Sequence, residues 1–273
     1  MTKINIGIHG IIELNHLPLK EQLKIVSKEF PNEIDGFEIF LFPNYVYNDH
    51  NKDKETIVEI LNCYMYNTFH IYSNMDWMLG NNRWTRLTYE TIQFFWEKGI
   101  VQRAVVHPDF IQDMDDFYLI VKDTGVKTGV ETLGKSSKWG NKYEQIRDLL
   151  YKYEDLDLVA DIAHIYEMAE NTNVSVEKYI DSFSRRLNQI HFSAPGNYYG
   201  NIQGIKDKIE TPHSFVSIKW NDIKSFLPCF DRLKHLLFTI EGVVPSGKLG
   251  RKMLLNEIEL IRETSSRKKH LPI

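Results

Sequence analysis

The feature that most constrains the fold of this 273-residue chain is an eightfold alternation of short apolar runs and longer amphipathic segments. The apolar runs cover residues 4–9, 36–42, 67–72, 102–107, 127–132, 156–161, 188–193 and 236–241. Between them, apolar residues recur at steps of three and four, which predicts amphipathic helices. Apolar strands joined by crossover helices form parallel sheets that are buried on both faces. Eight such units in this length predict an α/β fold, a single (β/α)8 TIM barrel over residues 1–273.

A doubly wound open sheet is the alternative arrangement of the same units. The first predicted strand is followed by GIHGIIELNH, which lacks the GxGxxG spacing of a dinucleotide-binding loop. Two parts of the chain are irregular. Residues 193–217 form a stretch that is long enough to be functional or disordered. Residues 264–273 are basic, and we expect them to be a flexible tail.

Charge and cysteine content narrow the class of protein. A formal net charge of −4 gives no sign of polyanion binding through overall charge, although it does not exclude a local basic groove. The two cysteines, Cys63 and Cys229, make neither a disulfide framework nor a zinc knuckle. No apolar run approaches the roughly 20 residues that span a bilayer, and the N-terminus does not read as a signal peptide. We therefore expect a cytoplasmic monomer that does not bind membranes.

Imidazoles and carboxylates recur at the C-terminal ends of the predicted strands. They are His9, Glu38, His70, His107, Glu131, Asp161, His191 and Glu241, with His164 just beyond the sixth strand and His213 after the seventh. All strand C-termini of a closed barrel meet at one rim, so these groups would converge on one cavity. Imidazole and carboxylate ligands without cysteine suit zinc, manganese or ferrous iron. The pattern therefore predicts a metal centre.

Each of these residues also has an ordinary structural interpretation. A single histidine at a strand end is more often a hydrogen-bonded packing residue than a ligand. Asp161 lies three residues before His164 and could simply cap the following helix. His9 could serve to support another ligand without binding a metal itself. Glu38, which precedes its strand end, could be structural. The recurrence of such residues at successive strand ends favours the metal centre.

The order of these motifs resembles the endonuclease IV family of the xylose-isomerase-like TIM barrels over nearly the whole chain. The motifs that carry the resemblance are IGIHG (6–10), FHIYS (69–73), VVHPD (105–109), VETLGKSSKWGNKYEQI (130–146), ADIAHIY (160–166), IHFS (190–193) and TIEG (239–242). In VVHPD, Asp109 stands where the family has a glycine. The resemblance implies the same barrel and a site with two or three metal ions, zinc first, with manganese or iron as alternatives.

The resemblance also implies which residues hold each ion. The first ion would have the ligands His70, His107 and Glu131, and the second Glu131, Asp161, His191 and Glu241. His164 and His213 would hold the third ion. The family has a further aspartate ligand two residues before the last histidine, where this chain has Thr211 next to Glu210. The third ion could therefore bind weakly, use Glu210 or be absent.

The activity that the resemblance implies is metal-dependent hydrolysis of DNA at abasic sites, a DNA-repair reaction. Clustered metal ions would activate a water molecule and stabilise both the attacking and the leaving oxygen. Glu131 would be the catalytic residue, because it would bridge two ions or orient the hydroxide. Aromatic and basic groups at the same rim would bind the DNA. The candidates are His9, Tyr72, Trp77, Arg83, Lys135 and Lys138.

Two other functions fit the same barrel. Sugar isomerases and epimerases of this superfamily use one divalent metal, held by a glutamate, an aspartate, a histidine and a glutamate after strands five to eight. Glu131, Asp161, His191 and Glu241 supply that set as well. His70, His107 and His213 favour the hydrolase, because a one-metal isomerase does not need three further imidazoles. A multi-iron oxidase or an inactive binding scaffold is the third alternative.

Overall fold

A computed structural model of the chain describes residues 2–171, 174–195, 213–217, 226–245 and 247–266. Within these residues, eight parallel strands close a barrel in the order β1-β10-β7-β6-β5-β4-β3-β2. They are β1 (Lys3–Gly7), β2 (Gly36–Leu41), β3 (Asn67–Ile71), β4 (Val101–Val106), β5 (Thr128–Glu131), β6 (Leu156–Asp161), β7 (Leu187–Phe192) and β10 (Leu237–Ile240). Because β1 pairs with both β2 and β10, the sheet has no free edge. The predicted barrel is confirmed, and the open sheet is wrong.

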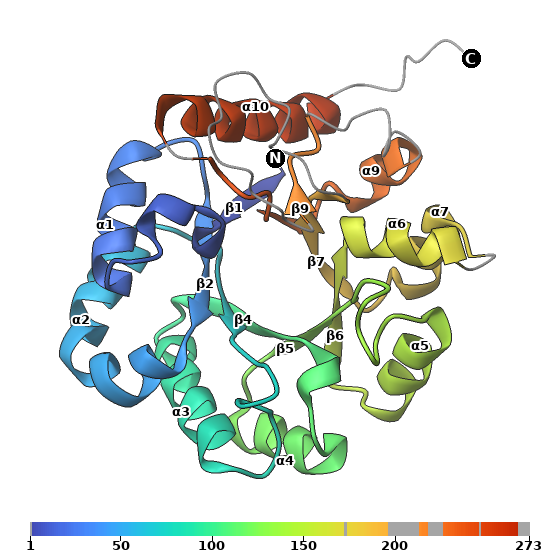
Figure 1. Cartoon of the computed structure of the whole chain (residues 1–273), viewed down its shortest axis with the longest axis horizontal. Helices are drawn as coiled ribbons and strands as arrows, with labels where there is room; N and C mark the ends of the chain where they lie inside the picture. Colours follow the sequence, from blue (N-terminus) through green and yellow to red (C-terminus); the bar gives the residue numbers. More distant parts are fainter. Residues whose placement is uncertain (1, 172–173, 196–212, 218–225, 246, 267–273) are drawn as a thin grey trace.

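Helices surround the strands (Figure 1). They are α1 (Leu19–Glu29), α2 (His50–Leu61), α3 (Arg83–Glu97), α4 (Met114–Thr124), α5 (Tyr143–Lys152), α6 (Ile162–Asn171), α7 (Val176–Phe183), α9 (Leu227–Leu233) and α10 (Gly247–Ser266). Their apolar faces pack on the outward-facing side chains of the strands. For example, the rings of Phe69 in β3 and Phe95 in α3 are 5.2 Å apart. Among the described residues, no helix is long and apolar enough to cross a membrane.

The end of α4 shows how local chemistry sets an element's length. The side chain of Asp113 accepts a hydrogen bond from the backbone N–H of Asp116 and so caps the first turn. The helix stops at Gly125, whose φ of 66° lies in the left-handed region that glycine adopts without strain. The aspartate and the glycine therefore fix both ends of the helix.

The structure departs from the sequence predictions at two places. Within 193–217, β8 (Ala194–Pro195) and β9 (His213–Ser214) form a short antiparallel ladder that was not predicted. The segment KWNDIKSFL (219–227), which the sequence predicts as a short helix, lies outside the described residues except for Phe226 and Leu227. Residues 264–266 belong to α10, so the first part of the predicted flexible tail is helical. Residues 267–273 lie outside the described part of the chain.

The middle of the barrel contains a hydrogen-bonded polar network. Glu38 of β2 accepts hydrogen bonds from the Thr68 hydroxyl at 2.9 Å and from Gln189 Nε2 at 2.7 Å. Gln189 Nε2 also donates to the Thr239 hydroxyl at 2.7 Å. All four side chains are buried, in a part of TIM barrels that branched apolar residues usually fill. Gln189 precedes His191 by two residues on the same strand face, so the network lies one layer below the rim.

Candidate metal centre

The barrel brings all eight predicted metal ligands together at its C-terminal rim. Glu131 and Asp161 are the last residues of β5 and β6, His70 and His191 lie near the ends of β3 and β7, and His107 and Glu241 directly follow β4 and β10. His164 lies in the first turn of α6 and His213 begins β9. Their ligand atoms form overlapping groups in which all atoms lie within 4.8 Å of one another. This convergence follows from the parallel strand order, which puts every strand end on one side.

Glu131 joins the first two groups through its two carboxylate oxygens. Its Oε2 lies 2.9 Å from His70 Nε2 and 3.2 Å from His107 Nε2. Its Oε1 lies 3.3 Å from His191 Nδ1. The contact from His70 to Glu131 passes through the barrel interior, because β4 separates their strands. One oxygen thus faces each group, as a bridging ligand would require.

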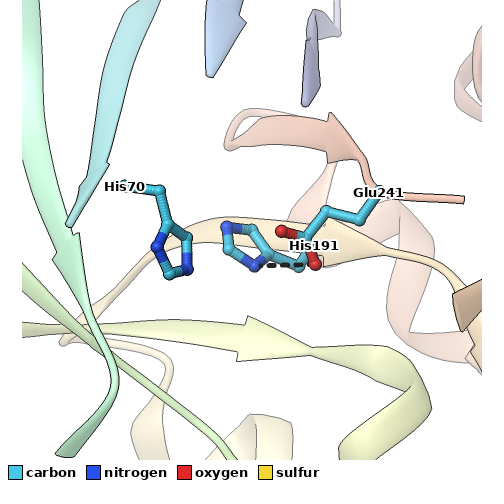
Figure 2. Close-up of side chains that lie close together, drawn as sticks. All are labelled: His70, His191 and Glu241. Atoms are coloured by element: carbon cyan, nitrogen blue, oxygen red, sulfur yellow. Dashed lines mark ion pairs between the residues drawn. The ribbon is translucent and has the colours of Figure 1, made fainter. Parts of the chain in front are cut away.

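His191 is the centre of the second group, with Glu131, Asp161 and Glu241. Its Nδ1 lies 3.1 Å from Glu241 Oε2, and Figure 2 shows the His191 ring between His70 and Glu241. Asp161 is the direct neighbour of His191 across the pairing of β6 with β7. His70, His191 and Glu241 also form a group of their own, which the sequence analysis did not predict.

The third group contains His164 and His213, as the resemblance implies, together with Asp161. Asp161 Oδ2 lies 3.5 Å from His213 Nδ1 and 3.8 Å from His164 Nε2. The resemblance implies that Asp161 belongs to the second group only, whereas the structure puts it between the second and the third. Thr211 and Glu210, on which the third ion was expected to depend, lie outside the described residues.

Opposite charges inside the cluster shift several pKa values. Burial lowers the pKa of His191, but the carboxylates of Glu241, Glu38 and Glu131 outweigh it and raise the pKa well above 6.5. Burial also raises the pKa of Glu131, but His191 and His107 hold it well below its usual range. The cluster of carboxylates therefore strongly favours a positive charge beside it.

The two imidazoles of the third group have pKa values shifted in opposite directions. Burial lowers the pKa of His164, yet Asp161 and Glu167 together raise it to about 9. Burial lowers the pKa of His213 to about 4, and the attraction of Asp161 offsets only part of this effect. One imidazole of the pair thus carries a proton at neutral pH while the other is neutral.

The residues of the cluster fit a divalent cation. Two buried atoms that face the cluster make no hydrogen bond within the described residues, namely Asp161 Oδ2 and His191 Nδ1. Buried polar atoms usually have such a partner, so these point to a missing one. Nitrogen and oxygen ligands without a thiolate suit zinc, manganese, iron or magnesium. Each ligand group in the structure contains at least one carboxylate to balance the charge of a cation.

The predicted DNA-binding residues lie around the rim in different settings. The Trp77 ring packs 5.3 Å from Trp84, and the Arg83 guanidinium lies 5.8 Å above the ring of Tyr47, so both belong to an aromatic cluster. The other four are His9, Tyr72, Lys135 and Lys138. Lys135 and Lys138 are exposed, Tyr72 is half-buried, and the ring of His9 lies 3.9 Å from that of Phe40 at a tilt of 46°. Their role in binding DNA stays a prediction.

Two supporting carboxylates have contacts that the sequence analysis did not predict. Glu38, for which the sequence leaves a structural role open, lies 3.2 Å from His191 Nε2. Glu167 lies 3.8 Å from His164 Nδ1. The sequence does contain a signal for the contact between Glu167 and His164, because residues three apart on a helix share a face. For Glu38 no signal in the sequence pointed to His191, because the two strands are not adjacent.

No family model matches the sequence, and no curated protein matches it significantly. Solved structures do match its fold along most of the chain. The probable 3-DHS dehydratase AsbF from Bacillus anthracis has a TM-score of 0.61 and 10% identity, covering 95% of this chain and 98% of its own. A xylose-isomerase-like TIM barrel protein from Mycobacterium smegmatis in complex with magnesium has a TM-score of 0.60 and 9% identity, with coverage of 97% and 96%.

A D-psicose 3-epimerase is also similar, with a TM-score of 0.56, 13% identity and 96% coverage of both chains. At such identities the likeness concerns the fold alone. The resemblance to endonuclease IV is therefore supported at the level of the barrel, and none of these three structures is an endonuclease. The chain has the fold of the xylose-isomerase-like TIM barrels.

Proposed function

We propose that this protein is a metal-dependent enzyme that isomerises or epimerises a small polyhydroxylated carbonyl compound. The observation that carries the proposal is one group of four buried ligands at the rim. The group consists of Glu131, Asp161, His191 and Glu241. It is the set that holds the single metal of sugar isomerases and epimerases on this barrel. Similar folds in an epimerase and a dehydratase, and in a barrel protein that binds magnesium, support this choice over DNA cleavage.

The chemistry of these reactions needs groups that move a proton at a carbon beside a carbonyl. A divalent cation held by the four ligands would polarise the oxygens of the substrate and make that C–H bond more acidic. Glu131 and Glu241 approach the same nitrogen, His191 Nδ1, at 3.3 and 3.1 Å. Two carboxylates this close can both reach one small substrate, so one can take the proton and the other return it.

A cavity of about 460 Å³ lies near the cluster, although none of the eight candidate ligands lines it. Its lining includes His9 and Phe40, and the ring of Phe40 stacks 4.1 Å from His70. Asn15 and Asn44 add neutral hydrogen-bonding groups to the lining. His16 and Asp49 also line the cavity, so its polar groups suit a small polar compound, and its volume is typical of small-molecule sites.

The test is to incubate the protein with Mn²⁺ or Mg²⁺ and a panel of ketoses and ketose phosphates in D₂O. We expect interconversion of sugars and incorporation of deuterium at one carbon. Glu131→Gln should lower the rate by about 100-fold or more, because it removes a proton-transferring carboxylate. Asp157→Asn is the matched control, because Asp157 pairs with Arg103 away from the rim and should leave the rate unchanged. Metal-loaded wild-type protein that exchanges no C–H proton with any of these sugars would exclude the proposal.

A second candidate is a multi-metal hydrolase that cleaves DNA at abasic sites. The groups His70–His107–Glu131 and Asp161–His164–His213 favour it, because an isomerase with one metal does not need them. Elemental analysis separates the two functions: one ion per chain favours the isomerase, and two or three zinc ions favour the hydrolase. Nicking of an abasic-site duplex by the wild type, with no nicking by Glu131→Gln, would establish the second candidate.

A further inference from the structure

Glu38 is a fully buried carboxylate in the middle of the barrel, below the rim where the candidate ligands lie. Its Oε2 accepts hydrogen bonds from Thr68 Oγ1 at 2.9 Å and from Gln189 Nε2 at 2.7 Å. The same oxygen lies 3.2 Å from His191 Nε2, and Oε1 lies 3.2 Å from it as well. A buried carboxylate is costly unless such donors surround it, so its position calls for a reason.

The contact between Glu38 and His191 crosses the barrel. Their strands, β2 and β7, are separated by β1 and β10 in the sheet order. No backbone pairing between β2 and β7 therefore fixes the distance between the two residues. On the Nε2 side of its ring, His191 is held, among the described residues, only by side chains that meet in the barrel interior.

The hydrogen bonds around Glu38 determine the role of His191 Nε2. Gln189 Nε2 has two hydrogens, and both are used, one by Glu38 Oε2 and one by Thr239 Oγ1. Gln189 therefore has no hydrogen left for the His191 nitrogen that lies 3.2 Å away. An ionised carboxylate can only accept, so His191 Nε2 must carry a hydrogen and donate it to Glu38.

The other ring nitrogen of His191 then faces the candidate metal ligands. Nδ1 lies 3.3 Å from Glu131 Oε1 and 3.1 Å from Glu241 Oε2. A metal-bound histidine commonly donates its second N–H to a carboxylate, which fixes both the tautomer and the orientation of the ring. Glu38 and His191 have this arrangement.

We propose that Glu38 is a positioning residue, which holds the His191 ring so that His191 binds a divalent cation through Nδ1. The proposal rests on the proposed metal centre. A neutral glutamine at position 38 would be a poor substitute. Three donors, from Thr68, Gln189 and His191, converge on the carboxylate, and the amide would turn an N–H₂ group toward at least one of them.

The experiment compares wild-type protein with Glu38→Gln, using Zn²⁺ as the probe. Zn²⁺ affinity is measured by calorimetry, and the ring nitrogens of His191 are followed by NMR of ¹⁵N-histidine protein. In the wild type, we expect the Nε2–H proton to be protected from exchange and Nδ1 to shift on Zn²⁺ binding. Glu38→Gln should weaken Zn²⁺ binding by about 10- to 100-fold and remove the protection.

Thr128→Val is the matched control. Thr128 is equally buried and bonds with the hydroxyl of Tyr89 at 3.0 Å, but it does not touch the cluster. This variant should keep the wild-type Zn²⁺ affinity. Should Glu38→Gln not fold, Thr68→Val replaces it, because it removes one donor that holds Glu38 in place. Thr68→Val should also weaken Zn²⁺ binding, and an unchanged affinity would overturn the inference.

The outcomes separate the inference from the proposed function. If Glu38→Gln binds Zn²⁺ as tightly as wild type, with the same protected Nε2–H signal, Glu38 does not position His191. If the wild type binds no divalent cation, the proposed function is wrong. In that case the Nε2–H signal still decides whether Glu38 holds the ring: its loss in Glu38→Gln supports that role, and its persistence overturns it.

Discussion

Asp161 uses its two carboxylate oxygens for two different purposes. Oδ1 accepts the backbone N–H of His164 at 3.0 Å and so caps the start of α6. Oδ2 faces His213 at 3.5 Å and belongs to the candidate metal centre. The capping and the metal-binding interpretations of the sequence are therefore compatible, because a cap needs only one oxygen.

The raised pKa of His164 predicts that metal binding at the third group releases protons. Asp161 and Glu167 raise that pKa to about 9 against the opposing effect of burial, so the ring carries a proton at pH 7. A cation needs the neutral ring, so its affinity should increase with pH from 7 to 9. Calorimetry in buffers of different ionisation heat measures the protons released. His164→Gln should release fewer than the wild type, and equal release from both proteins would contradict the prediction.

At the scale of elements, α10 holds the segment that carries His213. Glu257 of α10 is fully buried and accepts the backbone N–H groups of Val216 at 2.6 Å and Ser217 at 2.8 Å. Phe215 packs against Gly242, where a Cβ would lie 2.6 Å from the ring. The position of His213 at the rim thus depends on a helix near the other end of the chain.

Glu257 should make the stability of the protein depend on pH. Burial raises its pKa to about 7, although the N–H groups of Ser217 and Val216 act in the opposite direction. The folded state therefore binds a proton more tightly than the unfolded state, whose pKa is near 4.5. This stability is present below pH 4.5 and is lost as the pH rises through about 7. It amounts to on the order of 3 kcal/mol.

Urea denaturation at pH 4.5, 6 and 7.5 measures this effect. Between pH 4.5 and 7.5, the free energy of unfolding of the wild type should fall relative to that of Glu257→Gln, because the variant has no carboxyl group at this position to lose a proton. Glu259→Gln, which changes an exposed residue of the same helix, should behave like the wild type. Parallel pH profiles for wild type and Glu257→Gln would disprove the assignment.

At the scale of the whole molecule, the barrel concentrates acidic groups that come from strands far apart in sequence. Glu131, Asp161 and Glu241 are buried at one rim of it, and Glu38 is buried one layer below them. Removal of a bound cation leaves these carboxylates without its charge, so the folded state should be less stable without metal.

This effect is measurable as a shift in melting temperature. A ligand at 100 times its Kd stabilises the folded state by about 2.7 kcal/mol. For a chain of this size, removal of metal with a chelator should lower Tm by roughly 5–10 °C. Differential scanning calorimetry with added Mn²⁺ or Zn²⁺ and with EDTA measures the shift. Glu131→Gln should show a smaller shift, and an unchanged wild-type Tm would argue against a metal bound at the rim.

Local patterns predicted most of the elements. The strand predicted over 156–161 is β6 at the same residues, and the one predicted over 67–72 is β3 with one residue fewer. Such runs are predictable because apolar periodicity is a local property. The ladder of β8 and β9 was not predicted, because each strand has two residues and their pairing spans 193–217.

The sequence by itself determined the barrel and the residues that meet at its rim. Eight βα units can close in parallel, and parallel strands put their final residues on one side. Only the tertiary structure decided which atoms meet: that Glu131 faces two groups, that Asp161 joins the third, and that Glu38 reaches His191. The contacts of His191 with Glu131 and with Glu38 join strands that are not neighbours, and spacing along a chain carries no information about distances across its interior.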